Sequence, residues 1–291
     1  MNFNDEYKKR LTLINEHIES FFANECRNLE SFVTEAPVYS VLNGGKRVRG
    51  ILTLEVARML GGNEKTALEF AAAIEFIQAY SLVHDDLPCM DDDDYRRGQL
   101  SCHKKFGEAK GVLCGDSPLN LAYEVMLKSI LNGGDGEKKA AAEIAHRAGI
   151  FGMIKGQLID IDLMSKKDIT LPDVEKLIEY KTTALISAAA LAGARIANAD
   201  GEDIENIKNY AYHLGTAFQI RDDFEDEEED KLKEEEEKTP NFINLLGKEK
   251  AIEKLIYHRN SARDILKKYE KSEFLNTFPE YHPDKAISTF R

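Results

Sequence analysis

Two dense clusters of aspartate, far apart in the chain and each at the end of an apolar helical run, constrain this fold most. The first is Asp85-Asp86-Leu87-Pro88-Cys89-Met90-Asp91, followed by three more aspartates at 92–94, and the second is Asp222-Asp223-Phe224-Glu225-Asp226. Carboxylates packed this densely repel one another and resist burial, so the pattern favours divalent cations held between two facing clusters. Oxygen ligands of this kind indicate magnesium, and facing clusters need one common core.

Apolar residues recur with helical spacing through nearly the whole chain. No segment alternates apolar and polar residues clearly enough to predict a strand. We therefore expect an all-α fold in which residues 1–291 form a single-domain helical bundle. Alanine-rich runs at 71–73 and 188–190 are small on more than one face, so their helices should be central and border a cavity. The expected helical segments are 51–60, 67–84, 119–131, 138–164, 171–198, 202–223 and 249–269.

The acidity of the chain is local. Residues 222–237, which hold twelve acids and two lysines, and the six aspartates at 85–94 together carry a charge of -16, so the rest of the chain is slightly basic within the formal net charge of -13. No broad basic stripe is present, which argues against nucleic-acid binding. Residues 227–240 cannot bury so many charges, and we expect them to form a mobile acidic lid loop.

The sequence also predicts a cytoplasmic protein without a membrane span. The apolar stretch 184–197 is interrupted by Arg195 and is too short to cross a bilayer, so a buried helix is expected there. The four cysteines show no close pairing, and the first residues lack the apolar core of a signal peptide.

Spacing within the clusters suits a shared ion. On a helix, Asp222, Asp223 and Asp226 lie near one edge, because positions three and four apart are neighbours. Asp85 and Asp91 would diverge on a straight helix, but Pro88 should end the helix and let the chain return, so that Asp91 rejoins Asp85.

Cationic side chains accompany the carboxylates. Gly44-Gly45-Lys46-Arg47-Val48-Arg49 places cations after flexible glycines, and Arg96-Arg97-Gly98 directly follows the first cluster. Guanidinium groups match phosphate oxygens well, so these segments predict an anion site. His103, Lys104 and Lys181-Thr182 are further possible donors.

Taken in order along the chain, these motifs, together with Gly156-Gln157 and Phe218-Gln219, resemble those of the trans-polyprenyl diphosphate synthase family. Within that family, the bacterial short-chain enzymes are the nearest. The resemblance covers about 41–247. It implies an isoprenoid synthase-type bundle with a central cavity, usually a homodimer, in which an allylic diphosphate ionises and is alkylated by isopentenyl diphosphate before a proton is lost. Dimethylallyl and geranyl diphosphates would be the allylic substrates and farnesyl diphosphate the product.

The resemblance also assigns residue roles. Magnesium, as three ions when an allylic diphosphate is bound, would be held by Asp85, Asp86, Asp91, Asp222, Asp223 and Asp226. Arg96 and Lys181 would contact the allylic diphosphate, whereas Lys46, Arg49 and Arg97 would bind isopentenyl diphosphate. Thr182 and Gln219 would offer oxygen dipoles to the allylic cation, which makes them catalytic together with Lys181 and Arg96.

Chain length in this family is set by a bulky residue below the first cluster. Tyr80, with Ser81 beside it, lies five residues before Asp85, a little over one helical turn deeper, and would form the floor of a cavity for a C15 product. Ordinary core packing is the alternative role for Tyr80.

Three positions depart from the family pattern. Gln78 replaces a histidine that normally contacts isopentenyl diphosphate, and Lys155 replaces a glycine before Gly156. The lid loop is shorter and more acidic than usual, and Lys233 and Lys238 are the candidates for its usual lysine.

Several other functions compete with farnesyl diphosphate synthesis. A geranylgeranyl diphosphate synthase would share every motif, and a non-catalytic regulatory subunit is favoured only by the altered lid loop. A terpene cyclase would not need the isopentenyl site of Lys46, Arg49 and Arg97, and a metal-dependent phosphohydrolase would need a base for water that we do not identify.

Overall fold

The structure is a computed structural model that describes residues 2–230 and 241–280, with side chains described from Asn2 to Glu225 and from Asn241 to Pro279. The first half contains α1 (Phe3–Glu25), α2 (Ser31–Leu42), α3 (Val48–Met59), α4 (Glu64–Asp85), β1 (Tyr95–Arg96), β2 (Gln99–Leu100), α5 (Cys102–Phe106), α6 (Glu108–Asn132) and α7 (Asp135–Ala148). The second half contains α8 (Met153–Met164), α9 (Leu171–Ile178), η1 (Glu179–Thr183), α10 (Ala184–Ile196), α11 (Gly201–Asp230), α12 (Phe242–Leu246), α13 (Lys248–Leu266), α14 (Glu273–Thr277) and η3 (Phe278–Glu280).

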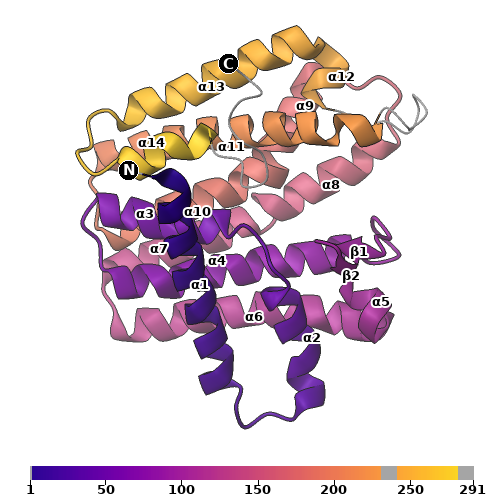
Figure 1. The fold of residues 1–291 in the computed structure, drawn as a ribbon, viewed down its shortest axis with the longest axis vertical. Coiled ribbons are helices and arrows are strands. Elements are labelled where there is room, and N and C mark those ends of the chain that lie inside the picture. Colours follow the sequence, from indigo (N-terminus) through magenta and orange to yellow (C-terminus); the bar gives the residue numbers. More distant parts are fainter. Residues whose placement is uncertain (1, 231–240, 281–291) are drawn as a thin grey trace.

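The predicted all-α bundle is confirmed, and its centre is built from the alanine-rich helices (Figure 1). In α10 every side chain except Arg195 is buried, and this helix packs against α3, α4, α7 and α11. Small residues allow the close approach: a Cβ added at Gly193 would lie 2.4 Å from the carbonyl oxygen of Thr53 on α3. The hydroxyl of Thr53 donates to the carbonyl of Ala189 at 3.1 Å, which satisfies a buried hydroxyl inside this contact.

The ends of α4 and α11 that carry the aspartate clusters lie at the same end of the bundle (Figure 1). By length and composition α4 is apolar enough to cross a membrane, but 67% of its apolar window is buried within the bundle. The burial of α4 against α3 and α6 accounts for that composition as core packing.

Three expectations need correction. The predicted helix at 138–164 is divided into α7 and α8, because the chain turns at 149–152 and a Cβ at Gly152 would meet the carbonyl oxygen of Arg147 at 1.8 Å. The expectation of no strand is wrong for β1 and β2, which pair as an antiparallel hairpin. Its connecting residues Arg97 and Gly98 both have positive φ, 55° and 75°, as tight hairpin turns require.

The prediction of a loop at 227–240 is wrong for its first four residues. Residues 227–230 continue α11, in keeping with the good helix propensity of glutamate. The remainder of the predicted loop, including Lys233 and Lys238, lies outside the described residues.

Candidate active site

The first aspartate cluster folds back on itself as predicted. Helix α4 ends at Asp85, and after the turn at Pro88 the amide of Asp91 donates to the carbonyl of Asp85 at 2.9 Å. Partial burial raises the pKa of Asp85 to about 6, and the Asp91 carboxylate acts in the same direction, while Lys181 opposes it. The ionised form of Asp85 is therefore disfavoured until a cation arrives, which suits a metal ligand.

Asp86, unlike Asp85, is held by an ion pair with Arg96. Its side chain is 3% exposed and accepts two hydrogen bonds from the guanidinium of Arg96, the one from Nε at 2.8 Å. Arg96 also donates to Asp93 at 2.9 Å. These contacts fix the β1–β2 hairpin, and with it Arg97, beside the end of α4.

In the second cluster, α11 presents Asp222 and Asp223 in two different environments. Burial raises the pKa of Asp222 to about 7, although Arg221 lies 3.4 Å away and opposes the shift. Asp223 is 6% exposed, and its two oxygens accept hydrogen bonds from Gln219 Nε2 at 3.0 Å and from the amide of Phe242 at 3.2 Å. Asp222 therefore remains available to a cation, whereas Asp223 holds other groups in place. The side chain of Asp226 lies outside the described residues.

Lys181 and Thr182 lie in η1, a π-helical segment between α9 and α10. Glycines bring two helices against it: a Cβ at Gly156 of α8 would lie 2.2 Å from the amide nitrogen of Lys181, and one at Gly215 of α11 would lie 2.7 Å from the hydroxyl of Thr183. Local π-helical geometry is frequent at functional sites, because it re-aims side chains within a helix.

The π segment connects the two aspartate clusters. Lys181 forms an ion pair with Asp160 and interacts electrostatically with Asp85 and Asp91. Its neighbour Thr182 donates through its hydroxyl to Gln219 Oε1 at 2.6 Å, and Gln219 in turn donates to Asp223. Gln219 donates its NH₂ group to Asp223, so its carbonyl oxygen faces Thr182 and accepts the hydroxyl hydrogen of Thr182. The oxygen lone pairs of Thr182 therefore remain available to a positively charged group.

A cavity of about 1010 Å³ lies beside these groups. We call it the cationic cavity, and the predicted site residues that line it are Lys46, Arg49, Gln78, Arg96, Arg97 and Asp222. Arg97 donates to the carbonyl of Gly44 at 2.8 Å. Gly45 has a φ of 114°, which favours glycine, and a Cβ there would lie 2.6 Å from the Arg97 guanidinium. Arg49 Nε is buried without a hydrogen-bond partner, which leaves a donor for an anion.

Tyr80 and Ser81 lie away from this lining. Tyr80 is 7% exposed within α4, its ring contacts His84 edge to face, and burial raises its pKa to about 12. Ser81 is partly buried and donates to the carbonyl of Gln78 at 3.0 Å.

The structure supplies a reason for Lys155, one of the departures from the family pattern. Its ammonium lies 3.7 Å from the centre of the Tyr180 ring, a cation–π contact that fastens α8 to the π segment beside Lys181.

Asp160, Asp93 and Gly215 take part in the site but were not predicted from the sequence. Asp160 follows Gly156 by four positions on α8, and this spacing on one helix face was the available signal. Asp93 lies only three residues before its partner Arg96, but outside a helix this spacing does not predict a contact, and Gly215 meets Thr183 of a different segment, which spacing does not reveal.

Known proteins are similar to this chain in sequence and in fold. Residues 30–239 match the family described as polyprenyl synthetase. The chain is 39% identical over 238 residues to a farnesyl diphosphate synthase of Bacillus subtilis, covering 79% of this chain and 80% of that protein. It is also 38% identical over 262 residues to the chloroplastic geranylgeranyl pyrophosphate synthase 11 of Arabidopsis thaliana, covering 87% and 71% of the two chains.

Solved structures extend the likeness over almost the whole chain. An FPP/GFPP synthase of Zymomonas mobilis, in an apo structure, superposes with a TM-score of 0.85 at 29% identity and covers 96% of this chain and 99% of that one. A geranyltranstransferase of Thermotoga maritima gives a TM-score of 0.79 at 27% identity, covering 94% and 95%. The chain therefore belongs to the polyprenyl synthetase family and is a prenyltransferase.

Proposed function

We propose that this prenyltransferase condenses isopentenyl diphosphate with dimethylallyl or geranyl diphosphate and releases farnesyl diphosphate. One observation carries the proposal: a single cavity is lined by six cationic residues and by Asp222 of the second aspartate cluster. A cyclase or a phosphohydrolase needs only one diphosphate site, and that site contains metal. We interpret the cationic cavity as a second diphosphate site that needs no metal, which favours a condensing enzyme.

The donor set fits magnesium. Asp85, Asp91 and Asp222 offer oxygen ligands and are not held by buried hydrogen bonds of the kind that Asp86 and Asp223 make. Burial raises the pKa values of Asp85 and Asp222 even though cationic side chains lie nearby, so a divalent cation would stabilise their ionised forms. Magnesium ions held by these three residues, with three ions expected, would neutralise the allylic diphosphate and stabilise the departing pyrophosphate. Asp86 and Asp223 would act as positioning residues.

The protein's own side chains supply the remaining requirements. Lys181 adds positive charge beside the first cluster, and hydrogen bonds to Asp86 and Asp93 hold the Arg96 guanidinium in place. The oxygen of Thr182, oriented through Gln219, stabilises positive charge on the allylic fragment as the C–O bond ionises. Lys46, Arg49 and Arg97 hold isopentenyl diphosphate so that its double bond can attack.

Tyr80 is the proposed limit to chain length. Its buried ring lies one helical turn beyond Asp85 on α4, where a growing chain directed into the bundle would meet it. The small, partly buried Ser81 beside it leaves the phenol ring as the larger obstacle. A geranylgeranyl diphosphate synthase remains the second candidate, because relatives named for that activity have comparable identity.

We further propose a cytoplasmic homodimer. All four cysteines are free thiols, as in reducing compartments. Exposed apolar side chains on α6 and α8, among them Leu113, Leu127, Leu131 and Leu158, provide a surface for a second copy. Light scattering coupled to size-exclusion chromatography should give twice the chain mass, and a monomer at micromolar concentration would contradict the dimer.

Calorimetric titration tests the two-site proposal. In EDTA, isopentenyl diphosphate should bind, whereas a non-hydrolysable allylic diphosphate analogue should require magnesium. Binding of neither diphosphate without metal would indicate a single, metal-dependent site and would favour the cyclase.

A further inference from the structure

Helix α1, which precedes the residues 30–239 that match the family model, braces the cation-bearing loop before α3. Tyr7 is 2% exposed, and its hydroxyl donates to the carbonyl of Lys46. Arg47 Nε donates to Asn15 of α1 at 2.9 Å. Arg10 pairs with Glu55 of α3 at 2.9 Å, so that α1 contacts this region at three points.

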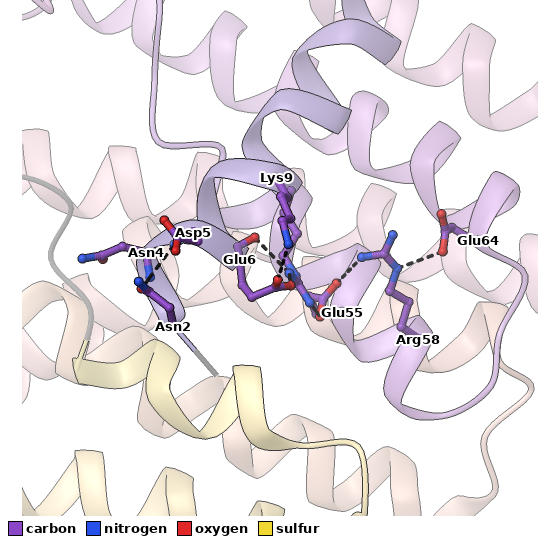
Figure 2. Close-up of polar contacts among 9 residues, drawn as sticks. Asn2, Asn4, Asp5, Glu6, Lys9, Glu55, Arg58 and Glu64 are labelled. Carbon is purple, nitrogen blue, oxygen red and sulfur yellow. Dashed lines mark hydrogen bonds and ion pairs between the residues drawn. The ribbon is translucent and has the colours of Figure 1, made fainter.

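Figure 2 shows the ionic part of this brace. Arg10 bridges Glu6 of α1 and Glu55 of α3, and the row continues through Arg58 to Glu64. Arg58 bridges Glu55 at 2.7 Å and Glu64 at 2.9 Å. The first turns of α1 are therefore fixed relative to α3, and the residues between these contacts have defined positions.

Two adjacent lysines on this helix turn have different surroundings. Lys9 pairs with Glu6 at 2.7 Å, as Figure 2 shows, and its side chain is 71% exposed. Lys8 is exposed too, but it lines the cationic cavity together with Tyr7 and Leu11. Within the part of the chain that the structure describes, Lys8 has no ion-pair partner. An exposed residue that lines a cavity lies at its mouth, so the Lys8 ammonium is available to an anion that enters there.

On α4 the cavity is lined by an uncharged donor. Gln78 can donate a neutral hydrogen bond to an anion there, but it adds no positive charge. A cation from another element would compensate for the weaker electrostatic attraction of a diphosphate.

We infer that α1 is part of the isopentenyl diphosphate site: Lys8 contacts the diphosphate, and Tyr7 is a positioning residue that holds the Lys46 backbone. The inference rests on the proposed function of the cationic cavity. Lys8 acts as a point charge on a flexible stem and requires no particular geometry of the phosphate oxygens.

The test compares Lys8→Met with Lys9→Met in the full-length protein. An exposed charge pair of this kind is worth about a three- to five-fold change in affinity at low ionic strength, and salt should weaken it. In Lys8→Met, the Kd for isopentenyl diphosphate measured by calorimetry in EDTA should increase by that factor, and so should the KM for isopentenyl diphosphate. The KM for geranyl diphosphate should change less than two-fold.

Lys9→Met is the matched control, because it removes the same charge one residue away and leaves net charge and helix propensity equal to those of Lys8→Met. Lys8→Arg should restore the wild-type Kd. For Tyr7, Tyr7→Phe removes only the hydroxyl, and it should increase the KM for isopentenyl diphosphate while circular dichroism stays unchanged.

The outcomes separate this inference from the proposed function. If wild type binds isopentenyl diphosphate in EDTA and Lys8→Met binds it equally well, or if both lysine variants lose affinity alike, Lys8 is not a ligand and the inference is wrong. If wild type itself does not bind isopentenyl diphosphate, the proposed function of the cavity fails first.

Discussion

Asp222 and Asp223 are neighbours in sequence, yet replacing each by asparagine should change stability in opposite directions. Burial raises the pKa of Asp222 from 3.8 to about 7, so above pH 3.8 its ionised form is less stable in the folded chain than in the unfolded chain. At about 1.4 kcal/mol per pKa unit, this shift sets an upper limit of about 4 kcal/mol. The side chain is 31% exposed and partly screened, so we expect Asp222→Asn to increase the free energy of unfolding by about 1–2 kcal/mol at pH 7.5 without magnesium.

Asp223→Asn should be destabilising. Both carboxylate oxygens accept, from Gln219 Nε2 and from the amide of Phe242, and the side chain is 6% exposed. An asparagine can accept only one of these hydrogen bonds and must place its own NH₂ group against the other donor. Leaving a buried donor unsatisfied costs about 1–3 kcal/mol, which is the expected decrease in the free energy of unfolding.

Urea unfolding followed by circular dichroism measures both changes. The first series is run at pH 7.5 in EDTA, and the second contains magnesium and inorganic pyrophosphate. In the second series, wild type should gain stability and Asp222→Asn should gain much less, because it has lost a metal ligand. A destabilised Asp222→Asn in EDTA, or a neutral Asp223→Asn, would refute the assignment of one residue to the metal and the other to positioning.

Three further changes probe other parts of the structure. Burial lowers the pKa of His258, which lies against His213, from 6.5 to about 4. As pH falls from 6.5 towards 4, His258 is therefore protonated in the unfolded chain but stays neutral in the folded chain. The free energy of unfolding, measured by urea titration, should fall by about 2 kcal/mol between pH 7 and 5, and His258→Gln should reduce this pH dependence. Gly156→Ala places a Cβ 2.2 Å from the amide nitrogen of Lys181, so kcat should fall at least about ten-fold by steady-state assay, and an unchanged kcat would show that the π segment need not be held there. Tyr80→Ala should shift products beyond C15 by mass spectrometry, whereas an unchanged C15 product would assign Tyr80 to ordinary core packing.

Sequence patterns predicted the large-scale organisation because it follows from long periodic signals and from proline. The buried positions of the alanine runs and the return of Asp91 to Asp85 agree with expectation. Four of the predicted cations line one cavity: Lys46 and Arg49 lie just before and within the first turn of α3, and Arg96 and Arg97 follow the first cluster.

Other features depend on tertiary contacts that a sequence does not encode locally. A strand of two residues carries no alternation, so β1 and β2 were missed. The predicted metal ligands looked equivalent in sequence, but burial and the partners supplied by Arg96, Gln219 and Phe242 distinguish Asp86 and Asp223 from Asp85, Asp91 and Asp222. The π segment likewise depends on the close packing of glycines from two other helices.

The most direct test of the central claim is product analysis of the purified protein. Incubation with magnesium, isopentenyl diphosphate and dimethylallyl, geranyl or farnesyl diphosphate in turn, followed by mass spectrometry, gives the chain length from each starter. We predict farnesyl diphosphate as the end point from the two shorter starters and no extension of the third. Products of C20 or longer would contradict the proposed product, and no condensation by the folded protein with any starter would contradict the function itself.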